Sequence, residues 1–215
     1  MTEAGRAIGV LISGRGSNLQ ALIDAIDERR LAAKIAVVIS NRGDAAGLER
    51  ARAAGIETLV VDHRSFPTRD AFDRALSSEL GARRVALVCL AGFMRLVGTP
   101  LLEAFPNAIL NVHPSLLPAF PGVDAQRQAL EHGVKVAGAS VHLVTAELDG
   151  GPIVLQAAVP VRDDDTAETL AARILIEEHR IYPEAASIVL SGGWTIQGRR
   201  FIRGGDSYQT PGINR

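Results

Sequence analysis

The first half of the chain alternates short apolar runs with helical patterns, and this rhythm limits the possible folds more than any other feature. Near-continuous apolar runs predict buried strands at residues 7–13, 34–40, 57–61, 85–90 and 108–112. Helical periodicity between these runs predicts helices at 18–29, 45–54, 68–80 and 98–104, with Ser17 as the cap of the first helix. Buried strands separated by helices are typical of a parallel sheet with helices on both faces.

The pattern changes in the second half. Residues 135–145 and 152–161 are long β-type runs joined by a turn-rich link at 147–151. A long amphipathic helix is expected over about 166–186, then a short hairpin at 194–203 and a loosely ordered tail at 204–215. These elements predict one α/β domain over 1–215: a mostly parallel, twisted sheet with a Rossmann-type half at 6–112 and antiparallel strands added in 113–203.

Composition excludes several classes of function. The net charge is -1, from 23 basic and 24 acidic side chains, which argues against a nucleic-acid partner. No apolar run approaches the roughly 18 residues of a membrane span, and residues 1–6 lack the features of a signal peptide. The single cysteine, Cys89, allows no internal disulfide and is expected to be a small core residue. We therefore expect a cytoplasmic protein without a membrane partner.

A glycine-rich loop, Ser13–Asn18, follows the first strand and precedes the first helix. Free N–H groups at a helix start bind anions well. A dinucleotide site would require a small residue where the chain has Leu19 and an acidic one near Asn41. The loop therefore favours a single phosphate monoester held by the amides of Gly16, Ser17 and Asn18, although a plain strand-to-helix turn is the competing interpretation.

Polar side chains end the fifth predicted strand. Strand alternation places Asn111 and His113 on one face, at the carboxyl end where open α/β sheets bind their ligands. An Asn amide can donate to a developing oxyanion, and a histidine can exchange a proton near neutral pH. Alone, the two could equally be a structural pair. Prolines at 114, 118 and 121 are expected to keep the next segment irregular.

Asp149, in the sequence Asp149-Gly150-Gly151-Pro152, is the candidate third member of this group. Alone, such an aspartate is usually a turn former. Together with an amide donor and an imidazole, however, a carboxylate makes a set suited to acyl transfer. No nucleophile accompanies the set, because Cys89 is expected to be buried and Ser115 has no evident base. Direct attack by a bound amine explains that absence.

Three segments, 111–118, 91–95 and 148–152, resemble the formyltransferase family that uses 10-formyltetrahydrofolate. The loop 14–20 and the segment 178–183 are similar to the branch that formylates phosphoribosylglycinamide in purine synthesis. The resemblance covers about residues 7–190. It implies a folate co-substrate, small-molecule partners, and a folate-binding and catalytic role for the second half.

The resemblance also implies roles for individual residues. The implied catalytic residues are Asn111, His113 and Asp149. The phosphoribosylglycinamide contacts would be Gly16, Ser17 and Asn18 for the phosphate and Glu178 for the ribose. The folate contacts would be Arg69, Met94, Arg95, Leu96, Val97 and Asn111, with the two arginines meeting the glutamate tail. Ser140 and His142 would support the site, although His142 could equally be a core histidine.

The expected mechanism is direct attack by the substrate amine, without a covalent intermediate on the protein. The amine attacks the formyl carbon, Asn111 and protonated His113 stabilise the oxyanion, and Asp149 stabilises the charged His113. The proton route through Asp149, His113 or water stays open. Relatives often carry histidines in the loop at 123–127, where this chain has Asp124 and Gln126, and neither is assigned a catalytic role.

Three other functions compete with the expected formyl transfer. A formyltetrahydrofolate hydrolase would share the Asn-His-Asp set but normally has an added N-terminal domain, and a methionyl-tRNA formyltransferase would need a C-terminal one; the length of the chain disfavours both. A non-catalytic nucleotide-binding module would explain the glycine loop but not the polar cluster.

No residue group has metal-ligand spacing, so no metal is expected. A monomer and a homodimer are both compatible with the sequence.

Overall fold

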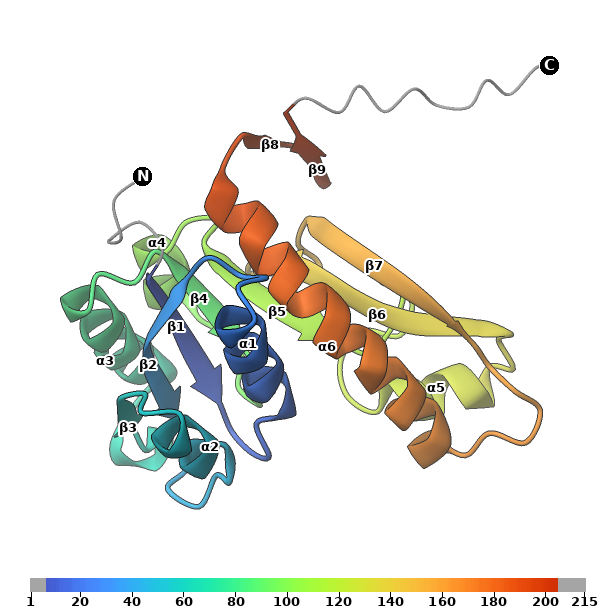
Figure 1. The fold of residues 1–215 in the computed structure, drawn as a ribbon, viewed down its shortest axis with the longest axis horizontal. Coiled ribbons are helices and arrows are strands. Elements are labelled where there is room, and N and C mark those ends of the chain that lie inside the picture. The colour runs from blue at the N-terminus through green and yellow to red at the C-terminus, as the bar shows by residue number, and fades with distance from the viewer. Residues whose placement is uncertain (1–6, 205–215) are drawn as a thin grey trace.

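A computed structural model describes residues 7–204 of the chain. Its strands form one nine-stranded sheet in the order β3-β2-β1-β4-β5-β6-β7-β9-β8 (Figure 1). The first five strands are parallel: β1 (Ala7–Ile12), β2 (Lys34–Ser40), β3 (Thr58–Val60), β4 (Leu87–Leu90) and β5 (Ile109–His113). This confirms the predicted Rossmann-type half. The strand order reverses between β1 and β4, so their carboxyl ends open a crevice of the kind that binds ligands in such sheets.

The second half adds antiparallel strands, as predicted. Strand β6 (Val136–Leu143) pairs antiparallel with β5 and with β7 (Ile153–Pro160). The hairpin of β8 (Trp194–Gln197) and β9 (Arg200–Arg203) joins the free edge of β7 through the pair Ile153 and Arg200. In the described part of the chain, the hairpin therefore extends the sheet of its own molecule. The predicted tail covers 204–215, and all of it except Gly204 lies outside the described residues.

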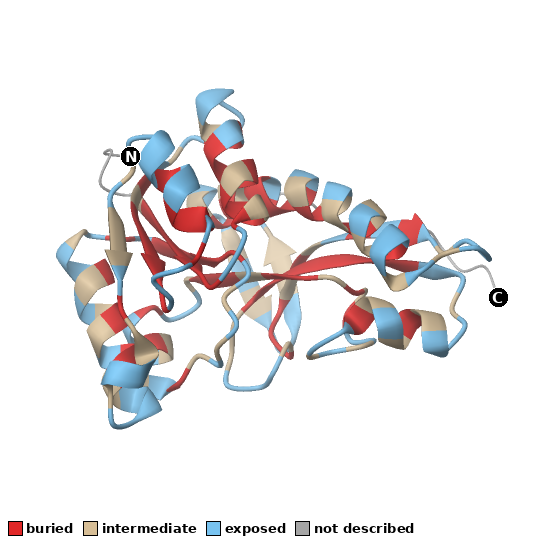
Figure 2. Cartoon of the chain, turned by 90° about the horizontal axis from the view of Figure 1, so that it is seen from below, coloured by how far each residue is buried: buried red, intermediate tan, exposed pale blue. Residues whose placement is uncertain are grey.

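Helices cover both faces of the sheet. Buried side chains of α1 (Ser17–Asp27), α2 (Gly47–Ala53), α5 (Ala125–Glu131) and α6 (Ala167–Ser191) contribute to one apolar cluster. Those of α3 (Arg69–Ala82) and α4 (Thr99–Ala104) form the cluster on the opposite face, and a short 3-10 turn, η2 (His63–Ser65), precedes α3. The central strands β1, β2, β4, β5 and β6 and the sheet-facing sides of the helices are the most buried parts of the molecule (Figure 2).

Three details of the helices differ from the sequence expectation. Ser17 does not cap α1: the helix begins at Ser17, and Gly16 holds the cap position in the left-handed conformation, at φ 73°. Helix α5 was not predicted, because its buried residues are small alanines that give little hydrophobic periodicity. Helix α6 extends beyond the predicted end at about 186 to Ser191, with Gly192 as its C-cap.

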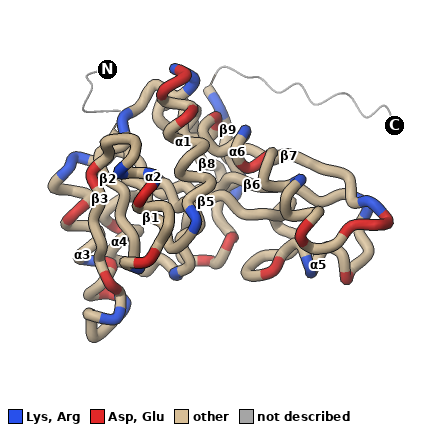
Figure 3. The backbone as a smooth tube through the Cα atoms, turned by 60° about the horizontal axis from the view of Figure 1, so that its bottom comes forward, with Lys and Arg blue, Asp and Glu red and all other residues tan. Residues whose placement is uncertain are grey.

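Cys89 is fully buried in β4, as predicted, and burial raises the pKa of its thiol to about 12. Basic and acidic residues are interspersed along the described chain (Figure 3). Between residues 7 and 204, no helix is long and apolar enough to cross a membrane.

Candidate active site

Two neighbouring strands supply the polar side chains at one end of the sheet. In the antiparallel pairing of β5 with β6, Asn111 lies opposite His142 and His113 lies opposite Ser140. The Asn111 amide nitrogen, Nδ2, lies 3.1 Å from Nε2 of His142. The other ring nitrogen of His142, Nδ1, is 3.1 Å from the carbonyl oxygen of Leu143. Nε2 of His142 accepts from Asn111 in the tautomer whose proton sits on Nδ1 and is donated to Leu143, and Nε2 donates in the other tautomer.

Asp149 lies between the two histidines. Its Oδ2 is 3.5 Å from Nδ1 of His113, and its Oδ1 is 3.5 Å from Nε2 of His142. The Gly122 backbone N–H also donates to Oδ2, at 2.8 Å. Burial opposes ionisation of Asp149, but the contact with His142, the Gly122 N–H and the charge of His113 outweigh it and lower the pKa of the carboxyl. An anionic carboxylate therefore sits beside both imidazoles at neutral pH.

The surroundings of His113 suit its doubly protonated form. Its Nε2 lies 2.9 Å from the carbonyl oxygen of Phe120, while Nδ1 faces the carboxylate of Asp149. Both ring nitrogens therefore face oxygen acceptors, and only the imidazolium can donate to both. His113 is buried, so few water molecules compete for these contacts.

Ser140 holds the segment that follows β5. Its hydroxyl donates to the carbonyl of Ser115 at 2.6 Å and accepts from the N–H of Leu117 at 2.9 Å and from Gln156 at 2.8 Å. Ser140 is fully buried, so the loss of this hydroxyl would leave several polar groups without a partner. Ser140 thus anchors the segment that contains Ser115 and Leu117 to β6. Asp124 lies at the start of α5, where it holds the N-cap position in the left-handed conformation.

The glycine-rich loop lies at the carboxyl end of β1 and packs tightly against α2. A Cβ at Gly16 would lie 2.6 Å from the Cα of Gly47, so only glycine fits there. Because α1 begins at Ser17, the first N–H groups of that helix have no partner within it and are available to an anion.

Asn18 connects this loop to α6. Its side-chain nitrogen donates to Oε2 of Glu178 at 2.7 Å, and both residues are buried. Burial raises the pKa of Glu178, and the hydrogen bond from Asn18 opposes that rise only in part. Among the described residues, the Asn18 Oδ1 atom has no hydrogen-bond partner. The pair therefore ties the start of α1 to α6 through buried polar groups.

A hollow of about 340 Å³ beside α1 reaches Ser17 and is also lined by Arg50 and His179. Arg50, on α2, donates through Nε to the carbonyl of Arg15 in the glycine-rich loop at 3.0 Å. The sequence pattern does not point to Arg50, because only the packing of α2 against the glycine-rich loop brings this arginine near that loop.

The expected folate residues lie on α3 and on the segment between β4 and α4. Arg69 is exposed in the first turn of α3, while Met94 and Leu96 are exposed and Arg95 and Val97 half-buried on the segment. This segment contacts the glycine-rich loop, since Ser13 donates its N–H to Gly92 at 3.2 Å. The two loops expected to hold the two substrates are therefore joined directly.

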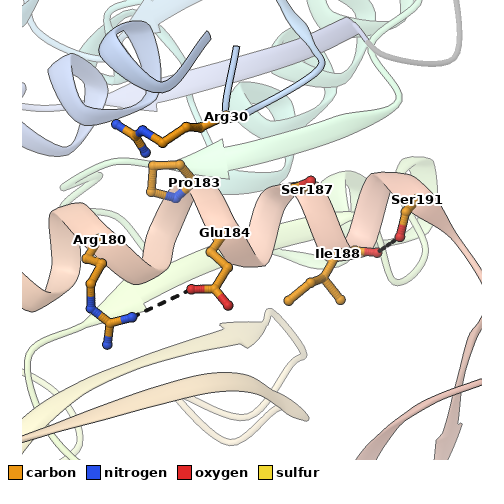
Figure 4. A pocket seen from close by; sticks show the side chains of 7 residues that line it. All are labelled: Arg30, Arg180, Pro183, Glu184, Ser187, Ile188 and Ser191. Carbon is orange, nitrogen blue, oxygen red and sulfur yellow. Dashed lines mark hydrogen bonds and ion pairs between the residues drawn. The ribbon is translucent and has the colours of Figure 1, made fainter. Parts of the chain in front are cut away.

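A second hollow, of about 380 Å³, lies along α6 and contains none of the predicted site residues. It is lined by Arg30 and by α6 residues between Arg180 and Ser191, with Arg180 reaching toward Glu184 (Figure 4). Within residues 7–204, no group of three or more His, Cys, Asp or Glu side chains is arranged to hold a metal ion.

Comparison with known proteins gives matches over most of the chain. The family described as formyl transferase matches residues 6–186. The phosphoribosylglycinamide formyltransferase of Escherichia coli is 47% identical over 192 residues, which are 89% of this chain and 88% of that protein. The human trifunctional purine biosynthetic protein adenosine-3 is 48% identical over 190 residues, 88% of this chain. The chain spans only 19% of the length of that human protein.

Solved structures agree. The glycinamide ribonucleotide transformylase 1 of Symbiobacterium toebii is 60% identical, with a TM-score of 0.92, and the match covers 94% of this chain and 96% of that one. A formyltetrahydrofolate deformylase from Pseudomonas syringae is 25% identical, with a TM-score of 0.84, covering 93% of this chain and 66% of that one.

Proposed function

The chain belongs to the formyl transferase family, and on this premise we propose that it transfers the formyl group of 10-formyltetrahydrofolate to the amine of phosphoribosylglycinamide. The observation that carries the proposal is the cluster of Asn111, His113, His142 and Asp149 at the carboxyl end of β5. Relatives that carry the name phosphoribosylglycinamide formyltransferase match most of the chain, which supports the choice of acceptor.

In the proposed reaction, the amine attacks the formyl carbon and gives a tetrahedral intermediate with a negatively charged oxygen. An Asn amide carries two N–H donors. One of those of Asn111 is directed at His142, which leaves the second for the oxyanion. A preorganised donor of this kind is worth roughly 3–4 kcal/mol of transition-state stabilisation.

His113 is the second proposed donor to the oxyanion. In this structure its Nε2 contacts the carbonyl of Phe120, so that contact must be exchanged for the substrate oxygen. Asp149 stays beside Nδ1 throughout and stabilises the imidazolium. The attacking amine must lose a proton and the departing folate nitrogen must gain one, and we place this transfer at Asp149, His113 or a bound water.

The remaining residues hold the two substrates. We propose that the amides of Gly16, Ser17 and Asn18 bind the phosphate and that Glu178 binds a ribose hydroxyl. The folate would lie against Asn111 and the segment from Met94 to Val97, with Arg69 and Arg95 at its anionic tail.

An absorbance assay for the tetrahydrofolate product tests the proposal. Purified protein receives 10-formyltetrahydrofolate with and without phosphoribosylglycinamide, and a double variant, Asn111→Ala with His113→Ala, serves as the matched inactive control. The expected result is product only when the amine is present. Product without the amine would indicate hydrolysis, the activity named for the deformylase structure that this chain resembles. No product in either case would favour a non-catalytic binding module.

A further inference from the structure

Two buried side chains hold the segment between β4 and α4 that carries the proposed folate contacts. The hydroxyl of Ser13 accepts a hydrogen bond from the N–H of Met94 at 2.8 Å. At the other end, the carboxylate of Asp73 accepts one from the N–H of Gly98 at 2.6 Å. Asp73 lies on α3, and only 1% of its surface is exposed. A buried carboxylate outside the proposed reaction centre thus fixes the end of this segment.

The charges around Asp73 connect α3 with this segment. Burial opposes the ionisation of Asp73, so its pKa is raised, while the Gly98 N–H and the positive charges of Arg69 and Arg95 oppose that rise. Arg69 comes from α3 and Arg95 from the segment. The charges of both arginines and of the neighbouring Asp70 thus act on the Asp73 carboxylate, with Asp70 raising its pKa.

Gly98 is where the two elements meet. A Cβ at this position would lie 2.6 Å from Oδ2 of Asp73 and 3.3 Å from Nε of Arg69. The backbone of Gly98 has φ -99°, which any residue can adopt. Glycine is thus required here for the close approach of the carboxylate and not for backbone freedom.

We propose that Asp73 is a positioning residue for the folate: it fixes the end of the segment at Gly98, next to Arg69, and so holds the segment that carries Arg95 against α3. The inference rests on the proposed function, because that function assigns the folate tail to the two arginines. Asp73 acts through the segment and touches no reacting atom.

Kinetic constants of two variants test this role. Asp73→Ala removes the acceptor for the Gly98 N–H and frees the end of the segment, so the KM for 10-formyltetrahydrofolate is expected to rise about tenfold or more. The KM for phosphoribosylglycinamide is expected to stay unchanged. Asp73→Asn keeps an oxygen that accepts the Gly98 N–H, and it should recover part of the lost folate affinity. An equal rise in both KM values, no rise in either, or no recovery in the Asn variant would overturn the proposal.

A matched control separates positioning from general stability. Ser77, one turn along α3, donates to the carbonyls of Asp73 at 2.8 Å and of Pro100 at 3.4 Å, without contacting the segment. Ser77→Ala should lower the Tm and leave the folate KM unchanged. Gly98→Ala, which displaces the carboxylate without removing it, should raise the folate KM as Asp73→Ala does.

Failure of the proposed function gives a different result. If the unmodified enzyme forms no product with both substrates present, the function itself is wrong. If it transfers formyl groups but Asp73→Ala has the same folate KM, only the role of Asp73 is wrong.

Discussion

The carboxylate of Asp149 lies 3.5 Å from Nδ1 of His113, although the two residues belong to distant parts of the sequence. His113 ends β5, and Asp149 lies in the turn between β6 and β7. In the antiparallel pairing of β5 with β6, Leu143 at the end of β6 lies opposite Leu110, so the turn folds back toward His113 to place Asp149 there. The Gly122 N–H holds the same carboxylate oxygen. The position of this carboxylate is therefore set by backbone contacts.

Replacing Asp149 with Asn tests the importance of its charge. Asp149 has a φ of 49°, and asparagine is among the residues that tolerate this left-handed conformation best. We expect Asp149→Asn to lower kcat by roughly 10²–10⁴, the usual contribution of a proton-transfer group. Steady-state formyl transfer measures this effect, and circular dichroism checks that the fold is kept. An unchanged kcat would show that the charge of Asp149 is not used.

Asp149 should also make stability depend on pH in a defined direction. Its folded pKa is lowered, so its carboxylate stabilises the fold above the unfolded pKa of about 3.9. This contribution is lost as the pH falls through the lower folded pKa. Urea unfolding of wild type and Asp149→Asn between pH 7 and pH 3 measures it. The difference in free energy of unfolding should shrink below about pH 4, as the Asp149 carboxylate is protonated; a difference that does not vary there would contradict the assignment.

Replacing Glu178 should make the free enzyme more stable and weaken its binding of substrate. Burial raises its pKa, so at neutral pH the fold bears the cost of a buried carboxylate. Glu178→Gln removes that charge and keeps an oxygen to accept from Asn18, so the free enzyme should become more stable at pH 7. A gain of roughly 1 kcal/mol would raise the Tm by about 2–4 °C.

The same Glu178→Gln variant should raise the KM for phosphoribosylglycinamide, because a neutral amide binds a ribose hydroxyl less strongly than a carboxylate. Differential scanning calorimetry and initial rates give the two quantities on one preparation. A lower Tm together with an unchanged KM would argue against both effects.

The phosphate loop can be tested with two neighbouring glycines. Gly16→Ala forces a Cβ into a residue at φ 73° and against the backbone of Gly47, which cannot move aside easily. We expect a loss of at least about 1–2 kcal/mol in the free energy of unfolding and a higher KM for phosphoribosylglycinamide.

Gly14→Ala is the matched control for this change. A Cβ at Gly14 meets nothing within 4 Å, so stability should be close to that of the unmodified protein. Equal destabilisation by the two variants would mean that the tight contact with Gly47 is unimportant.

Several features were predictable because they depend on local periodicity. The alternation of apolar runs and helical patterns is enough to predict the parallel half and the antiparallel addition. The expected helix over about 166–186 includes Pro183 but stops short of Ser191, the last residue of α6. Helix α5 was missed because its inward face consists of alanines, which lack a strong hydrophobic signal.

The sequence by itself determined that Asn111 and His113 share a face, because the side-chain period of a strand is two. It also indicated a tight loop before α1, since glycine adopts the left-handed conformation that Gly16 takes there. Only the tertiary structure decided that Asp149 lies between His113 and His142 and that Asp73 closes on Gly98. These pairs come from separate elements, so their distances follow from sheet pairing and helix packing, which no local pattern records.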